Sequence, residues 1–331
     1  MAFNPDYSKQ KGDVQHLLPL PDGRQVAYAC NGPEAATTVI LFFSGIMSIG
    51  LAHNVPAPCQ RINARWIAPT PAGMGRSSTR DLAVPYHVSL ARDMTALLEH
   101  LYPRGACYDT LYVAGGSYGT VMAQMLYGAP YRLFPAGRKI AGGLVLAGFS
   151  PYRHDVDYGK ALSWSTWLAV GPPSRLPFRP LQRAFRAAVG SKMGSSVEGA
   201  EQFLRRTVFD VMDADEKEAF RAHVDGQGET EDEFIARLAR STVECCKNWD
   251  GFMEVSDVIH SDWGFEPAAL DAAHCKPLLV VRSADDSIGS MNSEWLAANY
   301  KNATSKTIPG GHISSMYYMD AIWDEMITLA S

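Results

Sequence analysis

The sequence has 331 residues, enough for one large domain or for one domain that carries a sizeable insertion. Hydrophobic residues make up 47% of it and charged residues 20%, which predicts a buried core and excludes a mainly disordered chain. A formal net charge of −5 provides no basic surface that would hold nucleic acid or an anionic membrane.

Cysteine and glycine patterns predict neither a metal nor a cofactor. The six cysteines form no CxxC pair and no zinc pattern. The Gly73-Met74-Gly75 segment lacks the Lys-Ser/Thr of a P-loop and the third glycine of a dinucleotide fingerprint. Residues 1–15 lack a secretory signal, and no apolar stretch reaches the about 20 residues of a membrane helix. We expect a cytoplasmic protein with a small-molecule substrate and no nucleic-acid or membrane partner, and the oligomeric state stays open.

The first 150 residues alternate between strand-like and helix-like segments. Residues 14–21 and 25–30 flank a turn signal, Pro21-Asp22-Gly23, and are predicted to pair as a hairpin. Short apolar runs typical of strands buried on both faces span residues 38–43, 65–68, 110–114 and 140–147. Helices are predicted over residues 87–101 and 118–127. This alternation predicts an α/β fold, with a largely parallel sheet and helices on both faces.

The pattern changes between residues 151 and 264. Strand signals disappear there, and Ser195-x-x-Glu198 and Thr230-x-x-Glu233 are typical of capping boxes at helix starts. The first pattern then returns, with strands expected over 277–282 and 305–308 and helices over 293–300 and 315–329. We therefore predict three parts: a first part of the α/β core (1–150), a helical insertion (151–264) and a second part of the core (265–331).

Gly115-Gly116-Ser117-Tyr118-Gly119 is the only GxSxG pattern in the sequence. It follows an apolar strand directly and precedes a helix, which is the context that a nucleophile elbow requires. A serine on such a sharp turn brings the neighbouring backbone so close that side chains do not fit two residues before and after it, and glycine occupies both positions. The helix start would offer the Tyr118 N–H to a developing oxyanion.

An acid and a base follow in the chain order that this elbow requires: serine, acid, then histidine. Asp285 and Asp286 come after the strand 277–282, and His312 comes after the strand 305–308. His312 would take the proton of Ser117, and the carboxylate would orient the imidazole ring. The spacing alone leaves both aspartates open, with Asp286 preferred.

These residues resemble the α/β-hydrolase superfamily, and the similarity covers nearly the whole chain outside the helical insertion. Residues 71–77 (PAGMGRS) look like its PGxGxS segment. Residues 283–286 (SADD) look like its Gly-x-x-Asp turn, which selects Asp286, and Gly311-His312 looks like its final Gly-His. The sequence departs from the family pattern at Thr70, where an aspartate is usual.

The resemblance implies an α/β-hydrolase fold in which the 151–264 insertion is a helical cap over the site. Ser44-Gly45-Ile46 looks like the family's His-Gly oxyanion turn with serine in place of histidine, so the Ile46 N–H would be the second oxyanion donor. We expect Ser44 and Gly45 near the substrate. The insertion is rich in aromatic residues, which favours a hydrophobic substrate, and the candidates for contact with it are Trp164, Trp167 and Trp249.

The expected activity is that of a carboxylic ester hydrolase, which cleaves an ester, thioester or lactone through a Ser117–His312–Asp286 triad and an acyl-enzyme. Serine at the elbow argues against epoxide hydrolases and haloalkane dehalogenases, which carry aspartate there. An aminopeptidase similar to proline iminopeptidases stays open, with Glu201, Glu244 and Asp250 available for a substrate ammonium. A C–C bond hydrolase and a ligand-binding protein on a hydrolase frame also stay open.

Overall fold

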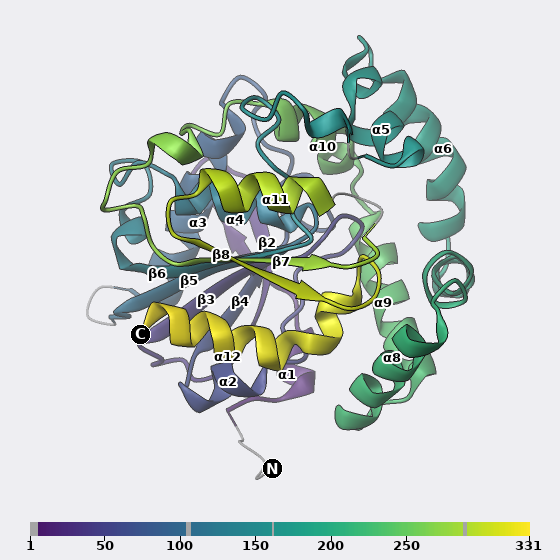
Figure 1. Ribbon diagram of the computed structural model, residues 1–331, viewed down its shortest axis with the longest axis horizontal. Helices are drawn as coiled ribbons and strands as arrows, with labels where there is room; N and C mark the ends of the chain where they lie inside the picture. The colour runs from purple at the N-terminus through teal and green to yellow at the C-terminus, as the bar shows by residue number, and fades with distance from the viewer. Residues whose placement is uncertain (1–5, 104–106, 161, 287–289) are drawn as a thin grey trace.

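An eight-stranded sheet with the order β1-β2-β4-β3-β5-β6-β7-β8 forms the centre of the molecule (Figure 1). The computed structural model describes residues 6–103, 107–160, 162–286 and 290–331. Strands β1 and β2 form the predicted hairpin, and β2 pairs antiparallel with β4, whereas all later neighbours are parallel. The strands are β1 (His16–Pro19), β2 (Gln25–Asn31), β3 (Thr38–Phe43), β4 (Arg65–Pro69), β5 (Thr110–Gly116), β6 (Ile140–Leu146), β7 (Leu278–Ser283) and β8 (Ala303–Ile308).

Helices cover both faces of this sheet (Figure 1). One face carries α3 (Tyr86–Leu101), α4 (Gly119–Tyr127) and α11 (Ser290–Asn299), and the other carries α1 (Lys9–Asp13), α2 (Ala57–Arg61) and α12 (Met319–Ala330). The predicted α/β-hydrolase fold class is therefore confirmed in its architecture. One expected helix differs: residues 315–329 divide into a 3-10 turn, Ser314–Tyr318, followed by α12.

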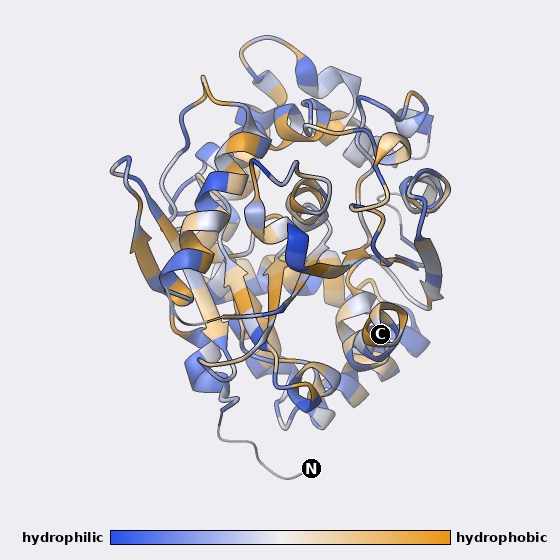
Figure 2. Cartoon of the chain, turned by 90° about the vertical axis from the view of Figure 1, so that its left-hand side faces the viewer, coloured by the Kyte–Doolittle hydropathy of each residue, from blue (hydrophilic) through white to orange (hydrophobic). Residues whose placement is uncertain are grey.

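The central strands have apolar side chains on both faces because each face packs against helices. Along β3, Val39 and Leu41 belong to the core on the α3–α4 side, and Ile40 belongs to the core on the α12 side. This alternation follows from the two-residue period of a strand. Trp323 of α12 fills the second core, with its ring centroid 5.5 Å from that of Trp66. Figure 2 shows the result, with hydrophobic strands at the centre and helices of mixed hydropathy around them.

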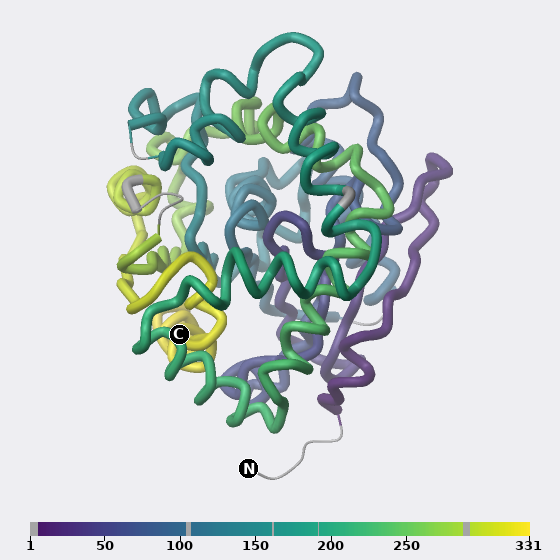
Figure 3. The backbone as a smooth tube through the Cα atoms, turned by 90° about the vertical axis from the view of Figure 1, so that its right-hand side faces the viewer, coloured from purple at the N-terminus to yellow at the C-terminus, as the bar shows by residue number. Residues whose placement is uncertain are grey.

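Residues between β6 and β7 form helices and no strand in the part of the chain that the structure describes. They lie beyond the carboxyl ends of β7 and β8 in Figure 1, and Figure 3 looks onto them as an arc in front of the sheet. We call them the helical segment: α5 (Trp164–Val170), α6 (Pro180–Met193), α7 (Val197–Leu204), a π-helix (Arg205–Phe209), α8 (Ala214–Gly226), α9 (Glu231–Cys245) and α10 (Asp250–His260). None of the helices over the described ranges is long and apolar enough to cross a membrane.

Of the two predicted capping boxes, one is confirmed and one is wrong. At the start of α9, Thr230 Oγ1 accepts a hydrogen bond from the Glu233 N–H at 3.2 Å, and Glu233 accepts one from the Thr230 N–H at 2.8 Å. At α7 the cap is Ser196 rather than Ser195, because the helix starts one residue later and Ser196 accepts from the Gly199 N–H at 3.0 Å. Two adjacent serines offer equal caps, so the pattern alone did not distinguish them.

Burial of His260, at the end of α10, favours the neutral form of its ring. Its Nδ1 lies 2.9 Å from the Ser256 carbonyl oxygen, and its Nε2 lies 2.9 Å from the hydroxyl of Tyr158. An Nδ1–H that donates to Ser256 and an Nε2 that accepts from Tyr158 satisfy the neutral imidazole at both nitrogens. Burial lowers the pKa of His260 below its ordinary value of 6.5; the bond to Ser256 opposes this effect, and the nearby Arg175 adds to it.

Acidification is therefore expected to destabilise the protein below about pH 6.5. As pH falls, His260 takes up a proton at a higher pH in the unfolded chain than in the folded protein. The stability that is present above the ordinary pKa is therefore lost as pH falls toward the pKa of the folded state. Urea unfolding at about pH 7.5 and about pH 5.5 measures this loss, at most about 1.4 kcal/mol per pH unit for each proton. The loss should be smaller in His260→Gln and unchanged in His100→Gln, whose side chain is exposed. Equal losses in wild type and His260→Gln would contradict the assignment.

Candidate active site

Ser117 stands on a sharp turn between β5 and α4. Its φ is +51°, in the left-handed region, and its N–H donates to the Leu146 carbonyl at the end of β6 at 2.8 Å. Its own carbonyl accepts from both the N–H and the hydroxyl of Thr120, at 3.0 and 2.6 Å. A left-handed conformation costs a residue with a side chain about 1–3 kcal/mol, and these hydrogen bonds hold it in place. Ser117 is therefore fixed, half-buried, at the carboxyl edge of the sheet.

The glycines two residues before and two residues after Ser117 leave no room for a side chain, as predicted. A Cβ at Gly119 would lie 2.1 Å from the Phe43 carbonyl oxygen at the end of β3. A Cβ at Gly115 would lie 2.4 Å from the backbone of Gly119. Gly116, in contrast, has nothing within 4 Å of that position. The close crossing of β5, α4 and β3 thus requires glycine at two places only.

His312 and Asp286 pair at the same edge of the sheet, on the loops that follow β8 and β7. The distance from His312 Nδ1 to Asp286 Oδ1 is 3.0 Å, and the side chains are 21% and 3% exposed. A carboxylate only accepts, so Nδ1 carries the proton and Nε2 is left as the acceptor. Asp285, in contrast, is exposed, and its N–H donates to the Gly310 carbonyl at 3.1 Å.

The turn after β3 packs against Ser117. A Cβ at Gly45 would lie 3.3 Å from Ser117 Cβ and 3.9 Å from its Oγ. Among the described residues, no hydrogen-bond acceptor faces the backbone N–H of Ile46 or of Tyr118. Met47 in this turn has a φ of +64°, and Ala147 after β6 has a φ of +48°. Left-handed residues thus follow three neighbouring strands, β3, β5 and β6, and such strain concentrates at functional sites.

The sequence matches the alpha/beta hydrolase family over residues 47–325, which is most of the chain. This chain belongs to that family. No curated protein sequence shows a significant match to it.

Solved structures share the fold of this α/β hydrolase over nearly its whole length. A hydrolase from Pseudomonas aeruginosa PA01 is 18% identical, with 95% of this chain and 97% of that one covered and a TM-score of 0.58. An esterase from Rhodococcus sp. ECU1013 is 15% identical, with 96% and 98% covered and a TM-score of 0.56. An epoxide hydrolase from metagenomes of hot environments is 16% identical, with 96% and 99% covered and a TM-score of 0.59. At these identities the likeness shows the fold alone.

A small pocket lies between the turn after β3 and the helical segment of this α/β hydrolase. The core contributes Ile46, Met47 and Met74, and the connection from α9 to α10 contributes the other side. The lining from the end of α9, the connection and the start of α10 consists of Cys245, Cys246, Asn248, Trp249 and Phe252. Only Asn248 brings a polar side chain other than a thiol. The pocket is therefore apolar, and it begins at the turn that touches Ser117.

The three candidate tryptophans lie in different surroundings. Trp249 lines the pocket beside Ile46. Trp164 and Trp167 stack on each other in α5, with ring centroids 5.1 Å apart, and Trp164 is 72% exposed. Neither of these two lines the pocket within the described part of the chain. Periodicity and composition did not separate an aromatic residue at the pocket from a pair at the surface.

Residues 71–77 attach the helical segment to the core, a role that the sequence analysis missed. The Gly73 carbonyl accepts from the Gly251 N–H at 2.7 Å, and the Gly75 N–H donates to the Cys245 carbonyl at 3.0 Å. A Cβ at Gly73 would lie 2.4 Å from the backbone nitrogen of Gly251. Its φ of +74° is a second reason for glycine there. The two ends of the α9–α10 connection are thus bound to the core by main-chain groups.

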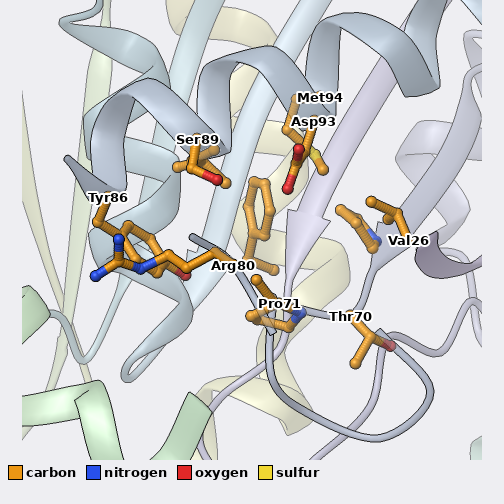
Figure 4. A pocket seen from close by; sticks show the side chains of 12 residues that line it. Val26, Thr70, Pro71, Arg80, Tyr86, Ser89, Asp93 and Met94 are labelled. Atoms are coloured by element: carbon orange, nitrogen blue, oxygen red, sulfur yellow. The ribbon is translucent and has the colours of Figure 1, made fainter. Parts of the chain in front are cut away.

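An ion pair beside a second pocket strengthens this attachment. Arg80 Nε lies 2.8 Å from a carboxylate oxygen of Glu254 on α10, and the two side chains are 12% and 7% exposed. The Arg80 guanidinium also lies over the ring of Tyr86 (Figure 4). Asp93, on the far side of this pocket in Figure 4, is bound by Arg24 at 2.6 Å. The charged groups around the second pocket are thus already paired with one another.

Proposed function

We propose that this α/β hydrolase cleaves an ester, thioester or lactone of a hydrophobic small molecule through an acyl-enzyme. Ser117 is the nucleophile, His312 the general base and Asp286 the carboxylate that orients the ring. The observation that carries the proposal is the position of Ser117: it stands on a strand-to-helix elbow, with a left-handed backbone, at the edge of the sheet that also carries the His312–Asp286 pair.

The chemistry follows from the proton on His312 Nδ1. Because Asp286 accepts a hydrogen bond from the Nδ1–H group, Nε2 is free to take the proton of Ser117 as the serine oxygen attacks the carbonyl carbon. The same proton then passes to the leaving group, and a water activated by Nε2 releases the acid. Asp286 stabilises the charged ring in both steps.

The developing oxyanion would bind to the N–H groups of Ile46 and Tyr118. Both lack an acceptor among the described residues, and both flank Ser117, one across the β3 turn and one at the start of α4. The start of α4 also directs the positive end of a helix dipole toward this position. Preorganised donors of this kind stabilise the transition state more than the substrate, because charge on the oxygen develops only there.

The mostly apolar side chains around the small pocket, beside the turn that touches Ser117, favour a substrate with a hydrophobic acyl or aryl group. The walls of the pocket carry no carboxylate within the described residues. Two of the three carboxylates considered for an aminopeptidase have partners of their own: Asp250 accepts from the Thr79 hydroxyl at 2.6 Å, and Glu244 pairs with Lys247. We therefore favour an uncharged substrate over an amine. The helical segment, with its α9–α10 connection over the pocket, serves in this proposal as the cap predicted for residues 151–264.

A fluorophosphonate probe tests the proposal directly, because it phosphonylates only an activated serine. We expect a single adduct on Ser117, mapped by mass spectrometry, and none in Ser117→Ala. In His312→Ala the labelling rate should fall at least about a hundredfold, the usual contribution of a general base. A folded wild-type protein that stays unlabelled would favour a ligand-binding protein on a hydrolase frame.

A substrate panel then separates the reaction classes. Aryl and alkyl esters, thioesters, lactones, aminoacyl aryl amides and a C–C hydrolase substrate should be compared at equal concentration. Turnover of uncharged esters with inert aminoacyl amides is the expected result. Preference for the amides would instead support the aminopeptidase.

A further inference from the structure

Helix α8 of the helical segment reaches the loop that carries His312. Its Glu216 accepts a hydrogen bond from the Gly311 N–H at 3.0 Å, and the Ser314 hydroxyl donates to the same carboxylate oxygen, Oε1. Gly311 precedes His312 directly, and Ser314 follows it by two residues. One carboxylate oxygen thus binds the loop on both sides of His312, through the Gly311 N–H and the Ser314 side chain.

The loop needs this restraint because its own sequence provides little. Gly310 and Gly311 precede His312, and Gly310 has a φ of +87°. Glycine has the largest backbone freedom of any residue, so a Gly-Gly pair is costly to order without outside contacts. A Cβ at either glycine would lie within 3.3 Å of Glu216 Oε1. Because glycine has no side chain, the carboxylate can approach the backbone here.

Glu216 is itself well fixed. Its N–H donates to the side chain of Asp213, the cap of α8, at 2.8 Å. Among the described residues no lysine, arginine or histidine forms an ion pair with it. Among the described residues, the hydrogen bonds to its carboxylate therefore come from the His312 loop, and charge-assisted bonds of this kind are stronger than neutral ones.

Apolar packing holds α8 against the same loop. Ile313, Met316 and Tyr317 pack on a hydrophobic cluster of the helical segment that includes Phe220 of α8. The ring centroids of Phe220 and Tyr317 are 5.6 Å apart. Asp286, after β7, thus binds the imidazole ring, and α8 contacts the residues of the loop around it.

We propose that Glu216 is a positioning residue for His312, so that the seating of α8 on the core is part of assembling the general base. The inference rests on the proposed function, because it assigns a task to the histidine of that site. Through Gly311 and Ser314 the carboxylate keeps the ring against Asp286, as the proposed general base requires. The helical segment then contributes a residue that positions the general base, in addition to covering the pocket.

Three variants test this proposal. Glu216→Ala removes the acceptor, whereas Glu216→Gln keeps a side-chain oxygen where Oε1 receives both hydrogen bonds. Glu218→Ala removes an exposed glutamate from the same helix and is the matched control. We expect Glu216→Ala to lower kcat about 10- to 100-fold with KM within about threefold, since small misplacements of a catalytic group have effects of this size. Glu216→Gln and Glu218→Ala should stay within about threefold of wild type.

A second measurement needs no turnover. In protein labelled with ¹⁵N-histidine, the Nδ1 proton of His312 that is bound to Asp286 should give a downfield resonance, assigned by its loss in His312→Gln. We expect this resonance in wild type, Glu216→Gln and Glu218→Ala, and its loss or broadening in Glu216→Ala. Full activity and an unchanged resonance in Glu216→Ala would overturn the proposal, and so would equal damage in the Ala and Gln variants. Because the resonance does not depend on Ser117, an unlabelled wild type would count against the proposed function alone.

Discussion

Replacing Asp286 with asparagine is expected to lower kcat by about ten-thousand-fold, whereas Asp285→Asn should leave it within about twofold. The two residues are neighbours in the chain, but only Asp286 is bonded to His312 Nδ1, with a side chain that is 3% exposed. An amide in its place can donate to the ring, which moves the proton to Nε2 and leaves no acceptor for the Ser117 hydroxyl.

Steady-state kinetics on the best ester of the panel measures both variants. KM should change little, because the carboxylate orients the base and does not bind substrate. The Asp285→Asn variant controls for the loss of one negative charge at the same loop. If both variants kept full activity, the His312–Asp286 pair would have no part in the reaction, and an equal loss in both would point to damage of the loop instead.

Gly119→Ala is expected to destabilise the fold by about 3 kcal/mol or more, or to prevent folding. Its Cβ would lie 2.1 Å from the Phe43 carbonyl oxygen, and the nearest atoms are all backbone atoms of Phe43 and Ser44, so no flexible side chain can move aside. The strain would have to be relieved by shifting α4 away from β3, which also opens the elbow around Ser117.

Urea unfolding measures this effect, and Gly116→Ala is the matched control. A Cβ at Gly116, three residues earlier, meets no atom within 4 Å, so this change should alter stability by less than about 1 kcal/mol. The prediction fails if the two alanine variants unfold at the same denaturant concentration. It also fails if Gly116→Ala is the more damaging of the two.

Much of this architecture was predictable because it depends on local pattern. Apolar runs and turn residues gave the correct strands, and the GxSxG context placed Ser117 on the turn where its φ is +51°. The sequence alone left Asp285 and Asp286 open, since both fit the same loop. The resemblance to the hydrolases selected Asp286, which is the aspartate that the structure pairs with His312.

What could not be predicted depends on contacts between distant parts of the chain. Glu216 lies about a hundred residues before the loop it binds, and no spacing rule connects a helix of the insertion with that loop. The same holds for Gly73, in the segment 71–77, and Gly251, at the start of α10, whose backbones would leave no room for a side chain at Gly73 although no sequence pattern connects them. Composition also does not place Trp164, which was expected near the substrate and is 72% exposed in the structure, so its contact with a substrate stays a prediction.

The attachment of the α9–α10 connection has a consequence for how enzymes of this shape diversify. Its bonds at Gly73 and Gly75 are made by main-chain groups, and every amino acid except proline supplies these. Residues that line the pocket from this connection, such as Cys246 and Trp249, can therefore be exchanged during evolution without loss of the bonds that attach the helical segment to the core. Selection is then free to change which groups fit beside this pocket, while the touching glycines Gly73 and Gly251 stay as they are.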